Sequence, residues 1–197
     1  MPATQTREEP LRAALFLDFD NVVSGLVQGA GAETALRFAS DPDAWMPWLA
    51  GDQPRRWLVR RCYMNPAGYI EDANGYKHYY SRFRPRLMGA GFEVQDCPRL
   101  TRFKNAADLR IVIDAMDLLS SPVFYEEFTL ISSDSDFVPL LLRLRAADRR
   151  TRLLAHPAVG RAVRGATDSV LGLDELAQTL GWLERDGFGA GEDDAEG

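Results

Sequence analysis

The chain has few of the residues that build disulfide scaffolds or histidine-based active sites. Cys62 and Cys97 are its only cysteines, and they are not spaced as a metal-binding knuckle. Its two histidines, His78 and His156, stand far apart in the sequence. A disulfide scaffold is therefore excluded, and a histidine zinc site or a Ser-His-Asp triad has little material to work with.

Long apolar runs are also missing. The longest run is well short of the roughly 20 residues needed to cross a bilayer, and residues 1–12 are polar without a signal-peptide core. We therefore expect a cytoplasmic protein with no membrane partner.

The 197 residues, 46% of them hydrophobic, suffice for one domain. We expect a flexible leader at 1–12, the domain at 13–183 and a disordered acidic tail at 184–197.

Lysine is scarce as well, so arginine carries most of the positive charge. The net charge of −6 argues against an anionic partner, but the distribution of charge matters more than the total. Residues 184–197 hold six acidic residues and one basic residue, whereas 55–110 hold twelve Lys or Arg against five Asp or Glu, or +7. Such a basic block suggests phosphate contacts, although a solvated surface is the simpler explanation for any one arginine.

Short apolar runs alternate with stretches of helical pattern. We predict strands at 13–18, 55–64, 92–96, 128–131, 151–155 and 169–171. We predict helices at 32–50, 75–88, 106–119, 137–147, 159–166 and 174–180, and a loop at 65–74. This alternation indicates parallel strands joined by right-handed crossovers, and thus an α/β fold: a three-layer α/β/α sandwich with a mainly parallel central sheet.

Carboxylates follow two of the predicted strands and begin one predicted helix. Asp18 ends the first strand, Asp134 and Asp136 follow the fourth, and Asp108 lies in the first turn of helix 106–119. Each acid alone is explained as a helix cap. Because ligands bind beyond the carboxyl ends of parallel strands, however, these acids are expected to converge, and they would repel one another unless a cation neutralised them. Oxygen ligands favour Mg²⁺ or Mn²⁺, which could activate a water for phosphodiester hydrolysis.

Polar and basic residues accompany these acids. Asn21 could hold a substrate phosphate or a metal-bound water, or it could end the strand as an Asx-turn. Asp20 is a weaker candidate. Basic residues before Asp108 could meet phosphates; they are Arg99, Arg102 and Lys104. Aromatic and basic residues also interleave in helix 75–88, where they could stack bases or form the apolar side of an amphipathic helix.

Three segments together resemble the NYN domain family, a branch of the PIN-like nucleases. They are DFDN at 18–21, KNAADLRIVIDAMDLL at 104–119 and ISSDSDFVPLLLRLR at 131–145, and the resemblance extends from about 13 to 171. It implies a PIN-like Rossmannoid sheet and a Mg²⁺- or Mn²⁺-dependent endoribonuclease acting on RNA. By motif match it assigns an acidic pocket to Asp18, Asp108, Asp134 and Asp136, with Asn21 and Ser133 alongside. Ser133 departs from the glycine that many members have before the acidic pair.

Two other functions stay open. Asp18-Phe19-Asp20 also resembles the nucleophile motif of haloacid dehalogenase-like phosphatases, in which Asp18 would be phosphorylated and Asp20 would act as the acid. Asn21 stands where that family has glycine, and the later motifs fit it poorly. The chain could also be a non-catalytic RNA-binding or scaffold protein. A homodimer formed through the aromatic residues of 75–88 is a further possibility.

Overall fold

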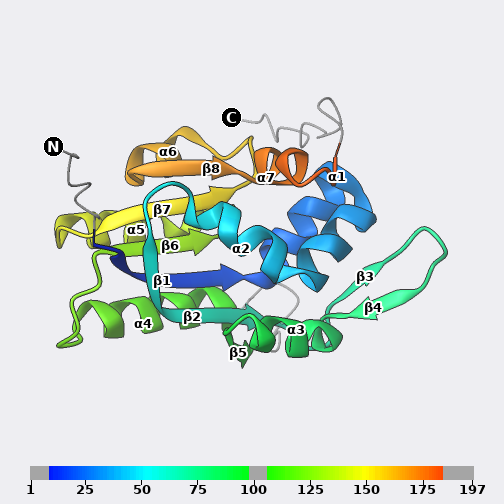
Figure 1. The fold of residues 1–197 in the computed structure, drawn as a ribbon, viewed down its shortest axis with the longest axis horizontal. Helices are drawn as coiled ribbons and strands as arrows, with labels where there is room; N and C mark the ends of the chain where they lie inside the picture. Colours follow the sequence, from blue (N-terminus) through cyan, green and yellow to red (C-terminus); the bar gives the residue numbers. More distant parts are fainter. Residues whose placement is uncertain (1–8, 98–105, 184–197) are drawn as a thin grey trace, which may run out of the picture.

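A sheet of six strands forms the centre of the computed structural model, which describes residues 9–97 and 106–183 (Figure 1). The strand order is β5-β2-β1-β6-β7-β8, and every neighbouring pair is parallel. The strands are β1 (Leu11–Asp18), β2 (Arg55–Met64), β5 (Glu93–Asp96), β6 (Glu127–Ile131), β7 (Arg150–Ala155) and β8 (Ser169–Gly172). The predicted parallel sheet is confirmed.

Helices cover both faces of this sheet. One face packs against α1 (Phe19–Ser40), α2 (Pro42–Ala50), α3 (Arg84–Gly89) and α7 (Leu173–Thr179), and the other against α4 (Ala106–Leu119), α5 (Val138–Ala146) and α6 (Arg161–Ala166). Successive strand residues point to opposite faces, so Leu15 and Leu17 join the first core while Ala14 and Phe16 join the second. The predicted three-layer sandwich is confirmed. No helix in the described ranges is long and apolar enough to span a membrane.

The first helix begins much earlier than predicted. It starts at Phe19, directly after β1, rather than near residue 32. The glycines at 25 and 29 are helical, and the backbone departs from helical geometry only at Gly31, where φ is 84°. Apolar residues before this kink, including Val22, Val23 and Leu26, are buried in the core. Their packing outweighs the low helix propensity of the glycines.

Residues 65–88 also differ from the prediction of a loop followed by a helix. They form an antiparallel hairpin of β3 (Tyr69–Glu71) and β4 (Lys77–Tyr79), then the 3₁₀ helix η1 (Tyr80–Phe83) and the short α3. Asp72 makes the turn, since its Oδ1 accepts from the backbone N–H groups of Asn74 and Tyr76 at 2.9 and 3.0 Å. Gly75 supports it with a φ of 77°. The hairpin projects beyond the carboxyl ends of the parallel strands (Figure 1).

Candidate active site

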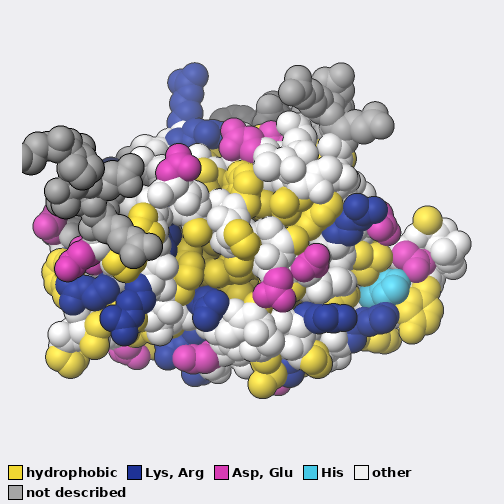
Figure 2. All heavy atoms as spheres, viewed as in Figure 1, with side chains coloured by type: hydrophobic (Ala, Val, Ile, Leu, Met, Phe, Trp, Pro, Cys, Tyr) yellow, Lys and Arg dark blue, Asp and Glu magenta, His cyan; other side chains and the backbone are white. Residues whose placement is uncertain are grey.

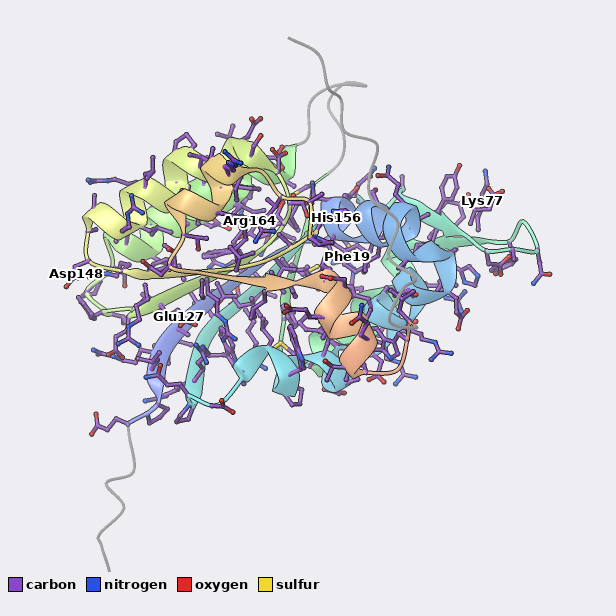
Figure 3. All side chains as sticks on the ribbon, turned by 90° about the horizontal axis from the view of Figure 1, so that it is seen from above. Phe19, Lys77, Glu127, Asp148, His156 and Arg164 are labelled. Carbon is purple, nitrogen blue, oxygen red and sulfur yellow. The ribbon has the colours of Figure 1, made fainter. Side chains whose placement is uncertain are left out.

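The carboxyl ends of β1 and β6 lie side by side in the sheet. Leu17 pairs with Ile131, so the residues that follow, Asp18 and Ser132, emerge at the same edge. Each is only 1% exposed. Phe19, next to Asp18, lies toward the same end of the molecule as His156 at the end of β7, as Figure 3 shows. The two acidic strand ends that were expected to converge thus share one edge of the sheet.

Ser132 joins these two strand ends through its hydroxyl group. Its Oγ donates a hydrogen bond to Asp18 Oδ2 at 3.1 Å and accepts one from the backbone N–H of Asp134 at 3.2 Å. Sequence reasoning overlooked Ser132 and named its neighbour Ser133. The strand register could have identified it, because Ser132 is the residue beside Asp18 once β1 and β6 are neighbours.

Asn21 makes a second connection between the two segments. Its Oδ1 accepts a hydrogen bond from the backbone N–H of Ser133 at 2.8 Å. Ser133 Oγ in turn accepts from the backbone N–H of His156 at 2.8 Å, which extends the connection to β7. The Asn21 side chain therefore holds the loop after β6 in place, and its oxygen reaches across the site.

Asp134 and Asp136 form the turn that follows β6. Asp134 Oδ1 accepts from the backbone N–H of Asp136 at 2.8 Å and thereby caps the 3₁₀ helix η2 (Ser135–Phe137). Asp18 likewise caps α1 by accepting from the N–H of Asn21 at 3.4 Å. Asp18 and Asp134 are therefore both helix caps, as each acid taken alone was explained. Their carboxylates lie at the same edge of the sheet.

Burial and mutual repulsion perturb the acids of this cluster. The pKa of Asp18 is raised to about 7, first by burial and then by the charge of Asp108, although the N–H of Asn21 and the hydroxyl of Ser132 oppose the rise. The pKa of Asp108 is raised to about 6, first by burial and then by Asp134, Asp136 and Asp20. The charge of Asp108, in the first turn of α4, thus influences the pKa of Asp18 at the end of β1.

The charge of Asp108 raises the pKa of Asp18, so the two acids titrate as a coupled pair and not independently. At neutral pH this cluster holds more negative charge than its hydrogen bonds compensate.

Asp20 belongs to the same cluster, although the sequence made it a weaker candidate. It is 6% exposed and contributes to the raised pKa of both Asp18 and Asp108. Its Oδ2 accepts a hydrogen bond from the backbone N–H of Asn65 at 2.8 Å. Asp20 therefore connects the acidic cluster to the segment that leaves β2.

The donor chemistry of the cluster fits a hard divalent cation. Asp108 Oδ1 is buried and has no hydrogen-bond partner among the described residues, and the pKa values of Asp18 and Asp108 are both raised, so a positive charge would relieve both conditions. Among the described residues, no three His, Cys, Asp or Glu side chains are arranged as a ready-made metal site. The cluster thus fits a divalent cation in its oxygen donors and in its uncompensated negative charge.

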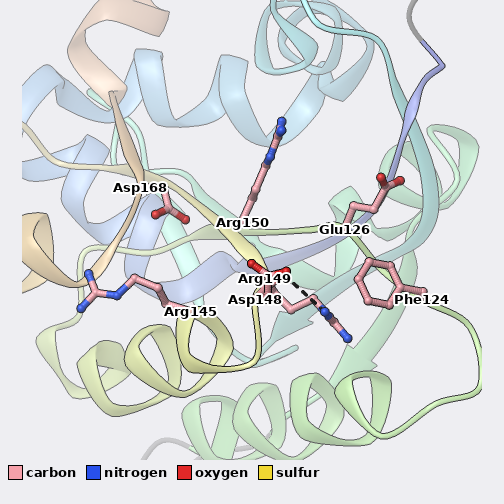
Figure 4. A pocket seen from close by; sticks show the side chains of 7 residues that line it. All are labelled: Phe124, Glu126, Arg145, Asp148, Arg149, Arg150 and Asp168. Carbon is pink, nitrogen blue, oxygen red and sulfur yellow. Dashed lines mark hydrogen bonds between the residues drawn. The ribbon is translucent and has the colours of Figure 1, made fainter.

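The basic residues predicted to bind substrate, Arg99, Arg102 and Lys104, lie outside the described residues. A pocket of about 550 Å³ lies elsewhere, near the starts of β6 and β7 (Figure 4). It is lined by Phe124, Glu126, Arg145, Asp148, Arg149, Arg150 and Asp168. Its three arginines face three acids, so it carries no net charge that would select a phosphate or a cation. Glu127 and Asp148 mark this opposite end in Figure 3.

The fold and the acidic edge place this chain among α/β proteins whose ligands bind beyond the carboxyl ends of parallel strands. The model of the NYN domain family matches residues 12–174, so the chain belongs to this family, which is part of the PIN-like nuclease superfamily. A crystal structure of a protein of unknown function, VPA0982 from Vibrio parahaemolyticus, is similar with a TM-score of 0.63 and 17% identity. The match covers 86% of this chain and 96% of that one, and it supports the fold. The comparison with curated proteins gave no match.

Proposed function

We propose that this protein is a Mg²⁺- or Mn²⁺-dependent endoribonuclease that hydrolyses phosphodiester bonds of single-stranded RNA. The observation that carries the proposal is the acidic cluster at one edge of the sheet. There Ser132 joins Asp18 to the backbone of Asp134, and burial and neighbouring carboxylates raise the pKa of both Asp18 and Asp108. A fold that tolerates such repulsion gains from a divalent cation, and membership of the NYN family supports phosphodiester cleavage as the reaction.

In this proposal the carboxylates of Asp18, Asp108, Asp134 and Asp136 hold the cation. A bound Mg²⁺ or Mn²⁺ lowers the pKa of a water and neutralises charge that develops on the phosphate. Ser132 and Asn21 keep the two strand ends in register through their hydrogen bonds to Asp18 and Ser133. Arg99, Arg102 and Lys104 are the proposed contacts with RNA phosphates, together with Ser133 at the mouth of the site.

A cleavage assay tests this proposal directly. Wild-type protein should cut an end-labelled oligouridine with Mn²⁺ or Mg²⁺, leave 5′-phosphate and 3′-hydroxyl ends, and lose activity in EDTA. Asp134→Asn should lower kcat at least about 100-fold, because it removes one charge from the cluster. Asp117→Asn is the matched control, since Asp117 lies near the far end of α4 and should leave kcat unchanged. Wild-type rates in Asp134→Asn would overturn the assignment.

The same experiments separate the alternatives. RNA binding that persists in EDTA, without cleavage under any metal, would indicate a non-catalytic RNA-binding protein. A phospho-aspartate trapped at Asp18 would indicate a phosphatase.

A further inference from the structure

The hairpin of β3 and β4 presents large aromatic side chains to solvent next to the acidic edge. Tyr69, Tyr76 and Tyr79 are 43%, 61% and 50% exposed. Singly exposed apolar residues are common on proteins, but three tyrosines on one short hairpin form a patch. Figure 2 shows hydrophobic and basic side chains gathered around a histidine at this end of the molecule.

The two faces of the hairpin differ in character. Ile70 is 1% exposed and anchors one face in the core, with His78 as its cross-strand partner. The register places Tyr69 opposite Tyr79 on the other face, and Lys77, two positions from Tyr79 along β4, lies on that same face. The two tyrosine rings meet edge to face with centroids 5.9 Å apart, and Lys77 Nζ lies 4.3 Å from the centre of the Tyr69 ring.

Hydrogen bonds stabilise the hairpin that carries these tyrosines. Asp72 Oδ2 and His78 Nε2 lie 2.9 Å apart, and His78 Nδ1 lies 2.7 Å from Arg82 Nη1. The backbone N–H of Tyr80 donates to the carbonyl of Gly68 at 2.8 Å and closes the base of the hairpin. Because these bonds fix the hairpin, a ligand that stacks on the tyrosines loses little free energy to ordering them.

The hairpin is joined directly to the acidic cluster. Tyr63 pairs with Asp18 in the sheet, and two residues later the N–H of Asn65 binds Asp20 Oδ2 at 2.8 Å. Tyr69 follows Asn65 by four positions, so their Cα atoms are at most about 14 Å apart. The hairpin is therefore within reach of a polymer whose backbone lies at the acids, at a distance of a few of its units.

We propose that the face of the hairpin formed by Tyr69, Tyr79 and Lys77 stacks the bases of single-stranded RNA as the strand leaves the acidic cluster. Tyrosine rings stack on any base, and Lys77 adds a positive charge beside them for a phosphate, offset in part by Glu71 opposite it in the register. Arg82 and Arg86 are exposed on the segment that follows. The proposal rests on the proposed nuclease function and specifies where that nuclease holds its substrate.

The test measures RNA binding and cleavage as a function of RNA length. Full-length wild type and the double variant Tyr69→Leu/Tyr79→Leu are titrated with fluorescein-labelled oligouridine of about 15 nucleotides, in Ca²⁺ to neutralise the acids. We expect the double variant to bind at least about tenfold more weakly. With Mn²⁺, wild type should cut the longer oligomer at a lower KM than a dinucleotide, which is too short to reach the hairpin, and the double variant should lose this advantage of the longer RNA.

Two further variants separate stacking from other causes. Tyr69→Phe/Tyr79→Phe retains the rings and should bind like wild type. Phe124→Leu removes an exposed aromatic ring over which the Arg149 guanidinium lies at 3.7 Å, at the opposite end of the sheet, and should also bind like wild type. Lys77→Gln should lower the slope of log affinity against log salt by about one unit.

Each outcome decides a different point. Wild-type binding and length dependence in the leucine variant would overturn the hairpin proposal while leaving the nuclease intact. Failure of wild type to bind or cut RNA would overturn both. A wild-type dimer that becomes a monomer in the leucine variant, with RNA affinity unchanged, would assign the patch to a second copy of the chain and overturn the proposal.

Discussion

Asp18→Asn should stabilise the metal-free protein at high pH. The carboxyl group of Asp18 is 1% exposed, and its pKa rises from 3.8 in the unfolded chain to about 7 in the folded protein. Well below pH 3.8 the carboxyl group is protonated in both the folded and the unfolded state, so it does not lower the free energy of unfolding. As the pH rises toward 7, the unfolded state gives up its proton while the folded state keeps it, so the free energy of unfolding falls.

The magnitude follows from this difference in pKa. About three pKa units at 1.36 kcal/mol each correspond to about 4 kcal/mol lost by pH 8, of which about 3 kcal/mol is lost between pH 5 and pH 8. Asparagine carries no charge, and its Oδ1 can still accept one of the two hydrogen bonds that Asp18 receives from Asn21 and Ser132. The advantage of Asp18→Asn over wild type should therefore grow by about 3 kcal/mol across this range.

Urea denaturation in EDTA at pH 5 and pH 8, analysed with a common m-value, measures this change. Asp117→Asn serves as the control, because that carboxylate lies far from the cluster on α4 and should give the same small effect at both values. Adding Mg²⁺ at pH 8 should raise the midpoint of wild type more than that of Asp18→Asn. A difference between wild type and Asp18→Asn that is the same at both pH values would refute the raised pKa of Asp18 as the source of the instability.

Two other substitutions test contacts at opposite ends of the sheet. Ser132→Ala should destabilise the protein by about 1–3 kcal/mol, because it removes a buried hydroxyl that donates a hydrogen bond to Asp18. It should also lower the rate of cleavage. A denaturation curve and a cleavage rate that both match wild type would contradict this role. Glu127→Gln should cost about 3–5 kcal/mol, because Arg55 binds both carboxylate oxygens at 2.6 and 2.9 Å in a buried pair. Cleavage per folded molecule should not change in this variant, since the pair lies at the far end of the sheet, and a loss below about 1 kcal/mol would show that the pair matters little.

The sheet could be predicted from local patterns because each buried strand is a short apolar run between polar segments. The run before Asp18 and the run before Ser132 indicated β1 and β6, and the alternation with helices indicated parallel pairing. The order of the strands was not predicted. That order makes β1 and β6 neighbours, and only with it does Ser132 become the partner of Asp18.

The hairpin was missed because its aromatic spacing imitates a helix. Tyr76, Tyr79, Tyr80 and Phe83 recur at intervals of three and four residues, which predicts one face of a helix. In the structure Tyr80 and Phe83 lie in a 3₁₀ turn and are buried, whereas Tyr76 and Tyr79 are exposed on the hairpin. The decisive signal was the turn from Asp72 to Gly75, with its side-chain hydrogen bonds and a glycine at positive φ.

The acidic edge shows how one arrangement serves both folding and the proposed chemistry. The N-terminus of α1 and the hydroxyl of Ser132 stabilise the ionised form of Asp18, yet its pKa is still raised to about 7. The fold alone therefore does not compensate the charge it collects there, because Asp108 adds to the cost of burial. The uncompensated free energy, about 4 kcal/mol for Asp18 at pH 8, is available to any ligand that neutralises the cluster and corresponds to roughly a thousandfold in affinity. A divalent cation meets that requirement, whereas a neutral ligand does not.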